Sequence, residues 1–259
     1  MNELSLNRFI NESDLEKVLV FADTETTGFN EKTDSILEIA LIATKDKKII
    51  SQYHTYIDPG ESVNIPSDSA KVHGITNEIM AEMRKNYIRY KHGETLNENE
   101  KIAIPLNEAW PEIIKILNGN YFIAHNARFD MKFLLASEQK LLENNPKLPR
   151  LNIKREIDTI TIAKILIPRG HVTLDALCNK FDVDKSSRAR FHGAMIDTLL
   201  LMDVFWKMIE ANNKTILDVS PKENKKSGRK IRQRTGVVIK PTKCEASNHN
   251  RFITNKIKS

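Results

Sequence analysis

The chain has 259 residues, of which 40% are hydrophobic and 29% charged, enough apolar material for one globular domain with a tail. No apolar run approaches the length of a membrane span, and the N-terminus lacks the short apolar core of a secretory signal, so we expect a cytoplasmic protein. The net charge of +6 at pH 7 is unevenly divided. Residues 219–259 carry twelve Lys or Arg against two Glu, a net of +10, which leaves −4 for residues 1–218.

In chain order, the first predicted element is a strand at about residues 17–25, which is apolar from Val18 to Ala22 and ends in Asp23 and Glu25. Residues i and i+2 of a strand face the same side, so both carboxylates project together while Thr24 points away. A strand buried on both faces does not normally end in two acids unless something neutralises them, and a divalent cation suits this geometry. A solvated strand end with two surface acids is the alternative.

The rest of the chain alternates between short apolar runs and helical periodicity, which predicts an α/β domain without internal repeats. Further strands are predicted at about 36–44 and 49–57, near 121 and near 155. Helices are predicted at about 69–83, 107–118, 127–142, 159–166, 173–181 and 194–211. Two stretches, at about 84–101 and 143–154, are predicted as surface connections. Cys178 lies in an apolar helical pattern, which favours a buried free thiol over a disulfide partner.

Asp130 lies at the start of the helix that follows the strand near residue 121, with Asn126 as the predicted N-cap. By helical spacing Asp130 shares a face with Leu134 and Leu141, so its carboxyl is predicted to point toward the core. A surface position for this acid is the alternative.

Asp197 begins the last predicted helix, on a face that continues through Leu201 and Val204. Gly193 and Ala194, one turn earlier, leave room for a metal and a phosphate. His192 precedes Asp197 by five residues, too far round a helix to stack on it, so it is predicted on the loop that enters the helix. A mobile loop position suits a proton carrier, and a capping or packing role is the alternative.

Three motifs of this chain resemble, in order and spacing, those of the DEDDh 3′→5′ exonucleases, which are named for four acids and a histidine. These motifs are residues 23–28, 125–130 and 192–197. Within this family, three other segments resemble the proofreading epsilon subunits of bacterial DNA polymerase III. These segments are residues 72–76, 158–159 and 174–178. The likeness covers roughly residues 17–210, and it departs at about 83–104, where a charged, Asn-rich stretch resembles an insertion.

The resemblance implies a ribonuclease H-like exonuclease fold, in which a mixed central sheet with three antiparallel strands is flanked by helices. The expected domains are an N-terminal extension at 1–16, a DEDDh exonuclease domain at 17–212 and a basic, flexible C-terminal tail at 213–259. The tail either adds sequence-independent contacts to a nucleic-acid backbone or is a solvated extension, and composition favours both equally.

The resemblance also implies two-metal hydrolysis, with Mg²⁺ or Mn²⁺ as the two divalent cations. Asp23, Glu25 and Asp197 would hold one ion, and Asp23 would bridge to a second about 4 Å away. Asp130 would act through a bound water. His192 would take the proton from the attacking water, since a histidine has an ordinary pKa of about 6.5. Neither cysteine is placed to favour zinc.

By the same resemblance, the backbone between Thr24 and Thr26 would receive the terminal 3′-hydroxyl, and His73 would lie beside the terminal nucleotide. The expected substrate-binding residues are Asp23, Thr24, Glu25, Thr26, His73 and Asp197. The alternative for His73 is structural, because a His-Gly pair is often a helix end with glycine in the left-handed conformation. Asp158 is expected to be structural.

The resulting hypothesis is a metal-dependent 3′→5′ exonuclease that releases nucleoside monophosphates from single-stranded DNA ends, as the proofreading subunit of a replicative polymerase. Its expected partners are a single-stranded 3′ end and a polymerase catalytic subunit, with a possible nucleic-acid contact by the basic tail and no membrane. One alternative is a DEDDh ribonuclease that trims RNA 3′ ends, because the three motifs do not distinguish deoxyribose from ribose. A further alternative is a non-catalytic module that binds a polymerase or nucleic acid.

Overall fold

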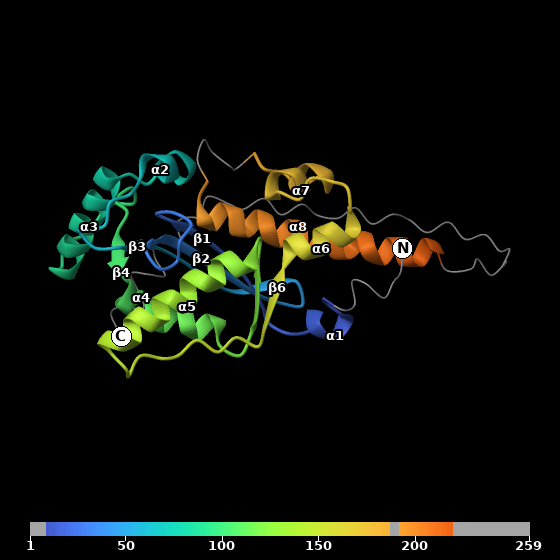
Figure 1. Ribbon diagram of the computed structural model, residues 1–259, viewed down its shortest axis with the longest axis horizontal. Coiled ribbons are helices and arrows are strands. Elements are labelled where there is room, and N and C mark those ends of the chain that lie inside the picture. Colours follow the sequence, from blue (N-terminus) through green and yellow to red (C-terminus); the bar gives the residue numbers. More distant parts are fainter. Residues whose placement is uncertain (1–8, 187–191, 220–259) are drawn as a thin grey trace. The chain divides into compact units, whose positions relative to one another are not determined.

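The computed structural model describes residues 9–186 and 192–219, with side chains up to residue 212 (Figure 1). The described residues up to Leu96 and from Glu100 to Val219 form one compact unit. The basic segment beyond residue 219 and the first half of the predicted N-terminal extension lie outside the described residues. The predicted domain boundary near residue 212 falls within a helix whose backbone runs on to Val219.

A six-stranded mixed sheet forms the centre of this unit, in the order β4-β3-β2-β1-β5-β6. Its strands are β1 (Leu19–Thr26), β2 (Ile36–Lys45), β3 (Lys48–Asp58), β4 (Ala103–Pro105), β5 (Tyr121–Ala124) and β6 (Arg155–Asp158). Strands β1, β2 and β3 are antiparallel neighbours, whereas β5 pairs in parallel with both β1 and β6, and β4 pairs in parallel with β3. The predicted mixed sheet with three antiparallel strands is therefore confirmed.

Strand β1 is central because every residue from Leu19 to Ala22 is apolar and buried. Its odd-numbered residues, including Phe21, pack against one layer of helices, and its even-numbered residues, including Val20, pack against the other. The alternation continues into the polar end of the strand. Asp23 and Glu25 consequently emerge on the face of Phe21, and Thr24 emerges on the face of Val20.

Two helical layers cover the sheet. One contains α6 (Thr159–Leu166), α7 (Leu174–Lys180) and the long α8 (Ala194–Val219), and the other contains α4 (Leu106–Leu117) and α5 (Ala127–Asn144). In Figure 1 α8, in orange, crosses the strands on one side, with α4 and α5, in green, on the other. The phenyl ring of Phe205 on α8 lies edge-on to that of Phe21, with 5.3 Å between ring centroids. None of the described helices is both long and apolar enough to span a membrane.

The prediction of one helix at 69–83, followed by a surface connection at 84–101, was wrong. Two helices are present, α2 (Ser67–His73) and α3 (Asn77–Lys91), separated at Gly74, which has a φ of 75° and ends α2 in the left-handed conformation. The charged residues of α3 resembled a loop, but they form ion pairs: the Arg84 guanidinium lies 2.6 Å from Asp58, and that of Arg89 lies 2.6 Å from Glu100.

Two short elements were not predicted, the helix α1 (Glu12–Leu15) and the strand β4. Each is shorter than the window over which hydrophobic periodicity can be recognised. The prediction that Cys178 is buried is confirmed, because its side chain is enclosed in the core beneath α8.

Candidate active site

Three of the predicted acids converge where β1 ends. One carboxylate oxygen from each of Asp23, Glu25 and Asp197 lies within 4.8 Å of the others. Asp23 and Glu25 share the face of β1 that α8 covers, and Asp197 lies in the first turn of α8. The sheet thus supplies two carboxylates and the helix packed upon it supplies the third.

Core packing determines where Asp197 points. Residues three, four and seven positions further along α8, Leu200, Leu201 and Val204, are all buried against the sheet, as the helical periodicity predicted. The backbone N–H of Asp197 donates to the carbonyl of Gly193 at 3.0 Å, which closes the first turn of the helix. The face that anchors α8 to the core therefore also carries the acid to the end of β1.

The electrostatics of this cluster favour a bound cation. Burial raises the pKa of Asp23 well above its ordinary value, and the neighbouring carboxylates of Asp130, Glu25 and Asp197 raise it further. In the described part of the chain, each charged group that acts on Asp23 is an acid, with Glu38 as the fourth. A buried group of carboxylates that repel one another fits a site for divalent cations, which prefer oxygen ligands.

Asp130 belongs to the other face of β1. Its side chain is 3% exposed, as predicted, and it accepts a hydrogen bond of 2.7 Å from the hydroxyl of Thr24. Burial raises the pKa of Asp130 to about 7, although the bond from Thr24 acts in the opposite direction. Asp130 is therefore close enough to influence Asp23, yet it lies outside the cluster of three ligand atoms.

His192 lies on the loop before α8, as the sequence predicted. The spacing argued against contact with Asp197, but the loop brings Nδ1 of His192 to 3.0 Å from Oδ2 of Asp197. The backbone N–H of His192 also donates to the carbonyl of Val72 at 2.9 Å. The imidazole side chain is 46% exposed and the Asp197 side chain only 6%, so the pair joins a buried acid to an accessible base.

His73 combines both interpretations made from the sequence. It ends α2 and is followed by a left-handed Gly74, as in an ordinary helix terminus. Its ring is nevertheless buried near the end of β1, where burial lowers its pKa while the backbone of Thr26 acts against that shift. Nδ1 of His73 accepts a hydrogen bond from the N–H of Ile75, so in the neutral ring the proton resides on Nε2.

Sequence reasoning passed over His125 as a site residue. His125, Asp23, His192 and Asp197 all line one pocket of about 360 Å³, which we call the metal pocket. Nδ1 of His125 lies 2.9 Å from the hydroxyl of Thr159, which itself donates to the carbonyl of Ala124. Since that hydroxyl has one proton, the imidazole must be the donor at Nδ1. Burial lowers the pKa of His125, whereas the charge of Asp158 and the backbone of Val172 act in the opposite direction.

Two phenylalanines close to the acidic motifs were also missed. Phe29 directly follows the turn after β1 and is 91% exposed, and its ring centroid lies 6.2 Å from that of Phe129, the neighbour of Asp130. Exposed aromatic rings offer stacking surfaces for nucleobases. The signal in the sequence was an aromatic residue directly after Gly28, where a turn would place it at the surface.

The predicted N-cap Asn126 precedes α5 but does not cap it with its side chain, because its backbone is left-handed, with a φ of 73°. The backbone N–H of Asn126 instead donates to Asp158, which also accepts the N–H of Ile160 at the start of α6. Asp158 therefore holds two segments of the metal pocket in position, in agreement with its expected structural role.

The sequence of this chain is similar to those of known proteins. A family model described as exonuclease matches residues 20–107 and 91–205. The DNA polymerase III subunit epsilon of Rickettsia typhi is 30% identical over 250 residues, which cover 90% of this chain and 94% of that protein. The equivalent subunit of Buchnera aphidicola subsp. Acyrthosiphon pisum is 29% identical over 248 residues, covering 92% and 94%.

A solved structure of exonuclease X in complex with 5′ overhanging duplex DNA superposes with a TM-score of 0.52 and 19% identity, covering 75% of this chain and 93% of that one. At this identity the likeness supports the fold alone. The mixed six-stranded sheet flanked by helices is a ribonuclease H-like fold. The chain belongs to the exonuclease family, as a 3′→5′ exonuclease that uses divalent metal ions.

Proposed function

We propose that this exonuclease removes nucleoside monophosphates from single-stranded DNA 3′ ends, as the proofreading subunit of a replicative DNA polymerase. The observation that carries the proposal is the convergence of Asp23, Glu25 and Asp197 within 4.8 Å at the end of a buried strand. The relatives named as epsilon subunits of DNA polymerase III match this chain along most of its length, which supports the assignment to replication.

In this proposal Asp23, Glu25 and Asp197 hold the divalent cations, and Mg²⁺ or Mn²⁺ suits their oxygen ligands. Such ions would supply Lewis-acid stabilisation of the scissile phosphate and of the leaving 3′-oxygen. Asp130 lies on the other face of β1, where it accepts a hydrogen bond from Thr24, and in this proposal it acts through a bound water.

His192 is the proposed general base. If Nδ1 donates to Asp197, the neutral imidazole has its lone pair on Nε2, which takes a proton from the attacking water. The hydrogen bond to Asp197 orients the ring and stabilises the imidazolium that forms. The side chain is accessible enough to pass this proton on to solvent.

The 3′-terminal nucleotide is proposed to lie along the end of β1. The backbone between Thr24 and Thr26 would receive the 3′-hydroxyl, with His73 beside the nucleotide. The side chain of Thr26 already donates to the carbonyl of Gly28, at 2.6 Å, so its backbone is the part that remains for substrate. The exposed ring of Phe29 lies one residue beyond this turn, where a terminal base would stack on it.

A degradation assay tests the proposal. A 5′-labelled single DNA strand and an RNA strand of the same sequence are incubated with Mg²⁺, Mn²⁺ or EDTA, beside an Asp23→Asn variant. Stepwise shortening from the 3′ end that needs both metal and Asp23 is expected, with DNA degraded faster than RNA. Faster decay of RNA would make the protein an RNA-trimming exonuclease. No metal-dependent cleavage, with retained binding to a polymerase, would leave only the non-catalytic module.

A further inference from the structure

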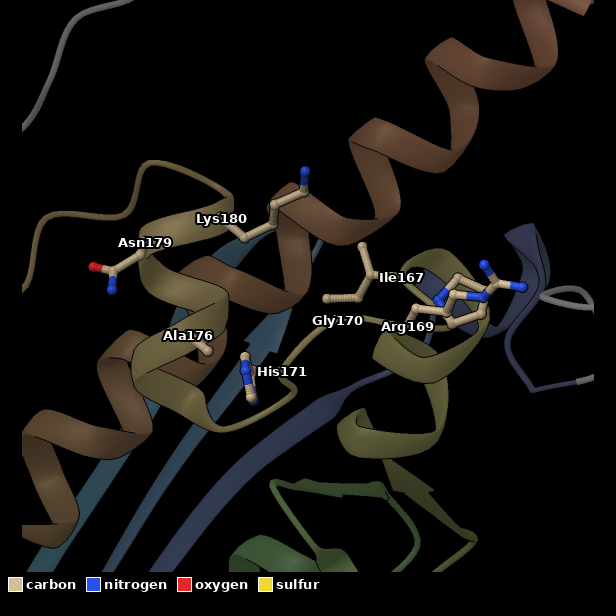
Figure 2. A pocket seen from close by; sticks show the side chains of 8 residues that line it. Ile167, Arg169, Gly170, His171, Ala176, Asn179 and Lys180 are labelled. Atoms are coloured by element: carbon tan, nitrogen blue, oxygen red, sulfur yellow. The ribbon is translucent and has the colours of Figure 1, made fainter.

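Beside the metal pocket lies a second open cavity of about 710 Å³ (Figure 2). It lies between the loop that follows α6 and the outer face of α7, and its lining includes Arg169, His171 and Lys180 but no acid. We call it the cationic pocket. The same loop continues through Val172 and the residues after it, which line the metal pocket. One loop thus separates a basic cavity from an acidic one.

A preorganised turn presents Arg169. Helix α6 ends as the N–H of Ile167 donates to the carbonyl of Ala163, and Pro168 cannot continue the helix. The N–H of Gly170 then donates to the carbonyl of Ile167 at 2.9 Å, which closes a four-residue turn with proline in its favoured second position. Arg169 is exposed at the tip of this turn. Because the turn restricts the backbone conformation, the direction in which the side chain leaves the backbone is restricted as well.

Helix α7 supplies the opposite wall. Ala176, Asn179 and Lys180 are spaced i, i+3 and i+4 along the helix and line the cavity, and Figure 2 shows the side chain of Lys180 on the side of Ile167 while that of Asn179 points away from it. The opposite face contains Leu177 and Cys178, which are fully buried in the cluster that includes α8. This anchoring keeps the outer face of α7 directed at the cavity.

Within the part of the chain that the structure describes, Arg169 and Lys180 differ from several other cations in having no acidic partner. Arg84, Arg89 and Arg155 each form an ion pair with an Asp or a Glu. Within residues 9–186 and 192–212, neither Arg169 nor Lys180 forms an ion pair. Among the described residues, the lining of the cavity therefore combines two cations that form no ion pair with the apolar side chain of Ile167.

We propose that the cationic pocket binds backbone phosphates of the substrate strand, a few nucleotides from the bond that is cut. This inference rests on the proposed function, because the strand is placed by its 3′ end in the metal pocket. Guanidinium and ammonium groups bind phosphate oxygens, and the apolar side chain of Ile167 suits a sugar or base edge. Arg169 is three residues from Val172, so their backbones are separated by at most about 11 Å.

The strand itself, and not a released nucleotide, is the proposed occupant. Exposed ion pairs are individually weak, so two cations would hold a free nucleotide poorly. A strand already bound at the metal pocket presents its next phosphates at a high effective concentration, and the same weak contacts then add to its affinity.

The test compares the double variant Arg169→Gln/Lys180→Gln with Lys147→Gln/Arg150→Gln, which removes the same charge from the exposed loop after α5. Melting curves verify that both variants fold. Binding of a long fluorescent DNA strand is measured in EDTA over a series of salt concentrations. Each phosphate contact to a single strand contributes about 0.7 to the slope of log K against log salt, so the pocket variant should lose about 1.4. The matched variant should keep the slope of the wild type.

Hydrolysis with Mg²⁺ gives the second measurement. The pocket variant should show a KM for the long strand that is raised roughly tenfold, whereas its kcat/KM for a dinucleotide, which is too short to reach the cationic pocket, should change less than about twofold. An unchanged salt slope and KM would overturn the proposal. Equal losses on both substrates would also overturn it, because the loop would then act through the metal pocket.

Binding of a nucleoside monophosphate tests the alternative occupant of the cationic pocket, which is a free nucleotide. If it binds the wild type but not the pocket variant, the cavity is a site for the free nucleotide and the strand proposal is wrong. If the wild type cleaves neither substrate, the proposed function fails, and the salt slope in EDTA still decides whether the cationic pocket binds a strand.

Discussion

The two pockets on either side of the loop between α6 and α7 carry charges of opposite sign, buried in one and exposed in the other. The metal pocket is lined by acids that are buried away from water, and burial together with mutual repulsion raises the pKa of Asp23. The cationic pocket carries Arg169 and Lys180 at the surface, where water solvates them. Buried charges of the same sign are unfavourable without a counter-ion, whereas each exposed charge adds a weak attraction for a ligand of opposite charge. The first arrangement suits chemistry and the second suits strand positioning.

The largest effect is expected from Asp23→Asn, which removes a ligand from the metal pocket while preserving the shape of the side chain. Metal-assisted stabilisation of charge is worth several kcal/mol, so kcat should fall roughly a thousandfold or more. The fold should be unaffected or stabilised without metal, because one of the repelling carboxylates is gone. Parallel melting and activity curves measure both effects, and a variant that unfolds would identify Asp23 as a structural residue.

His192→Gln should have the next largest effect. Loss of a general base usually costs about 10²- to 10⁴-fold, and the glutamine amide can still donate to Asp197. The rate should also become less dependent on pH, because the group that accepts the proton is gone. Rates measured over a range of pH quantify this loss. The variant His92→Gln, at an exposed histidine, is the matched control. Rates equal to those of the wild type would show that another group takes the proton.

The metal pocket was largely predictable because local rules place its parts. Alternation along β1 puts Asp23 and Glu25 on one face, and the helical period of α8 puts Asp197 on the face of Leu201 and Val204. Since both apolar faces must be buried against each other, the acids at their ends necessarily meet. Such patterns predicted the α/β class, whereas the ribonuclease H-like fold was implied by the family resemblance.

The features that were missed depend on contacts between distant parts of the chain. The orientation of His125 depends on Thr159, which is brought to it by the pairing of β5 with β6. The extension of α3 depends on Asp58 of β3, which pairs with Arg84. Periodicity within a window of residues cannot detect such partners.

The effect of pH on stability should differ between the metal-free and metal-bound protein. The folded protein retains the proton of Asp130 up to about pH 7, whereas the unfolded chain releases it near the ordinary value of 3.8. The folded state therefore binds more protons than the unfolded state within this window, and the free energy of unfolding should fall as pH rises from about 4 to about 7. Melting temperatures in EDTA should decrease over this range by a few degrees.

The variant Asp130→Asn should flatten that decrease, since the amide oxygen still accepts the hydrogen bond from Thr24 but no longer ionises. Glu16→Gln, at an exposed acid, is the matched control and should keep the slope of the wild type. Added Mg²⁺ should raise the melting temperature more at high pH, where the carboxylates are charged and bind it best. An equally steep decrease in Asp130→Asn would assign the protons to Asp23 and its other neighbours.

The smallest effect is expected from single changes at Arg169, and it would sharpen the distinction between the pockets. Arg169→Lys retains the charge but loses the planar fork that binds two phosphate oxygens, so the salt slope should be unchanged while affinity falls up to about fivefold. Arg169→Gln should also lose about 0.7 of the slope. Binding of a long strand in EDTA measures both variants. If the Arg169→Lys and Arg169→Gln variants had the same salt slope, the charge at the tip of the turn would not contact a phosphate. The attraction of the cationic pocket would then have to come from Lys180 alone.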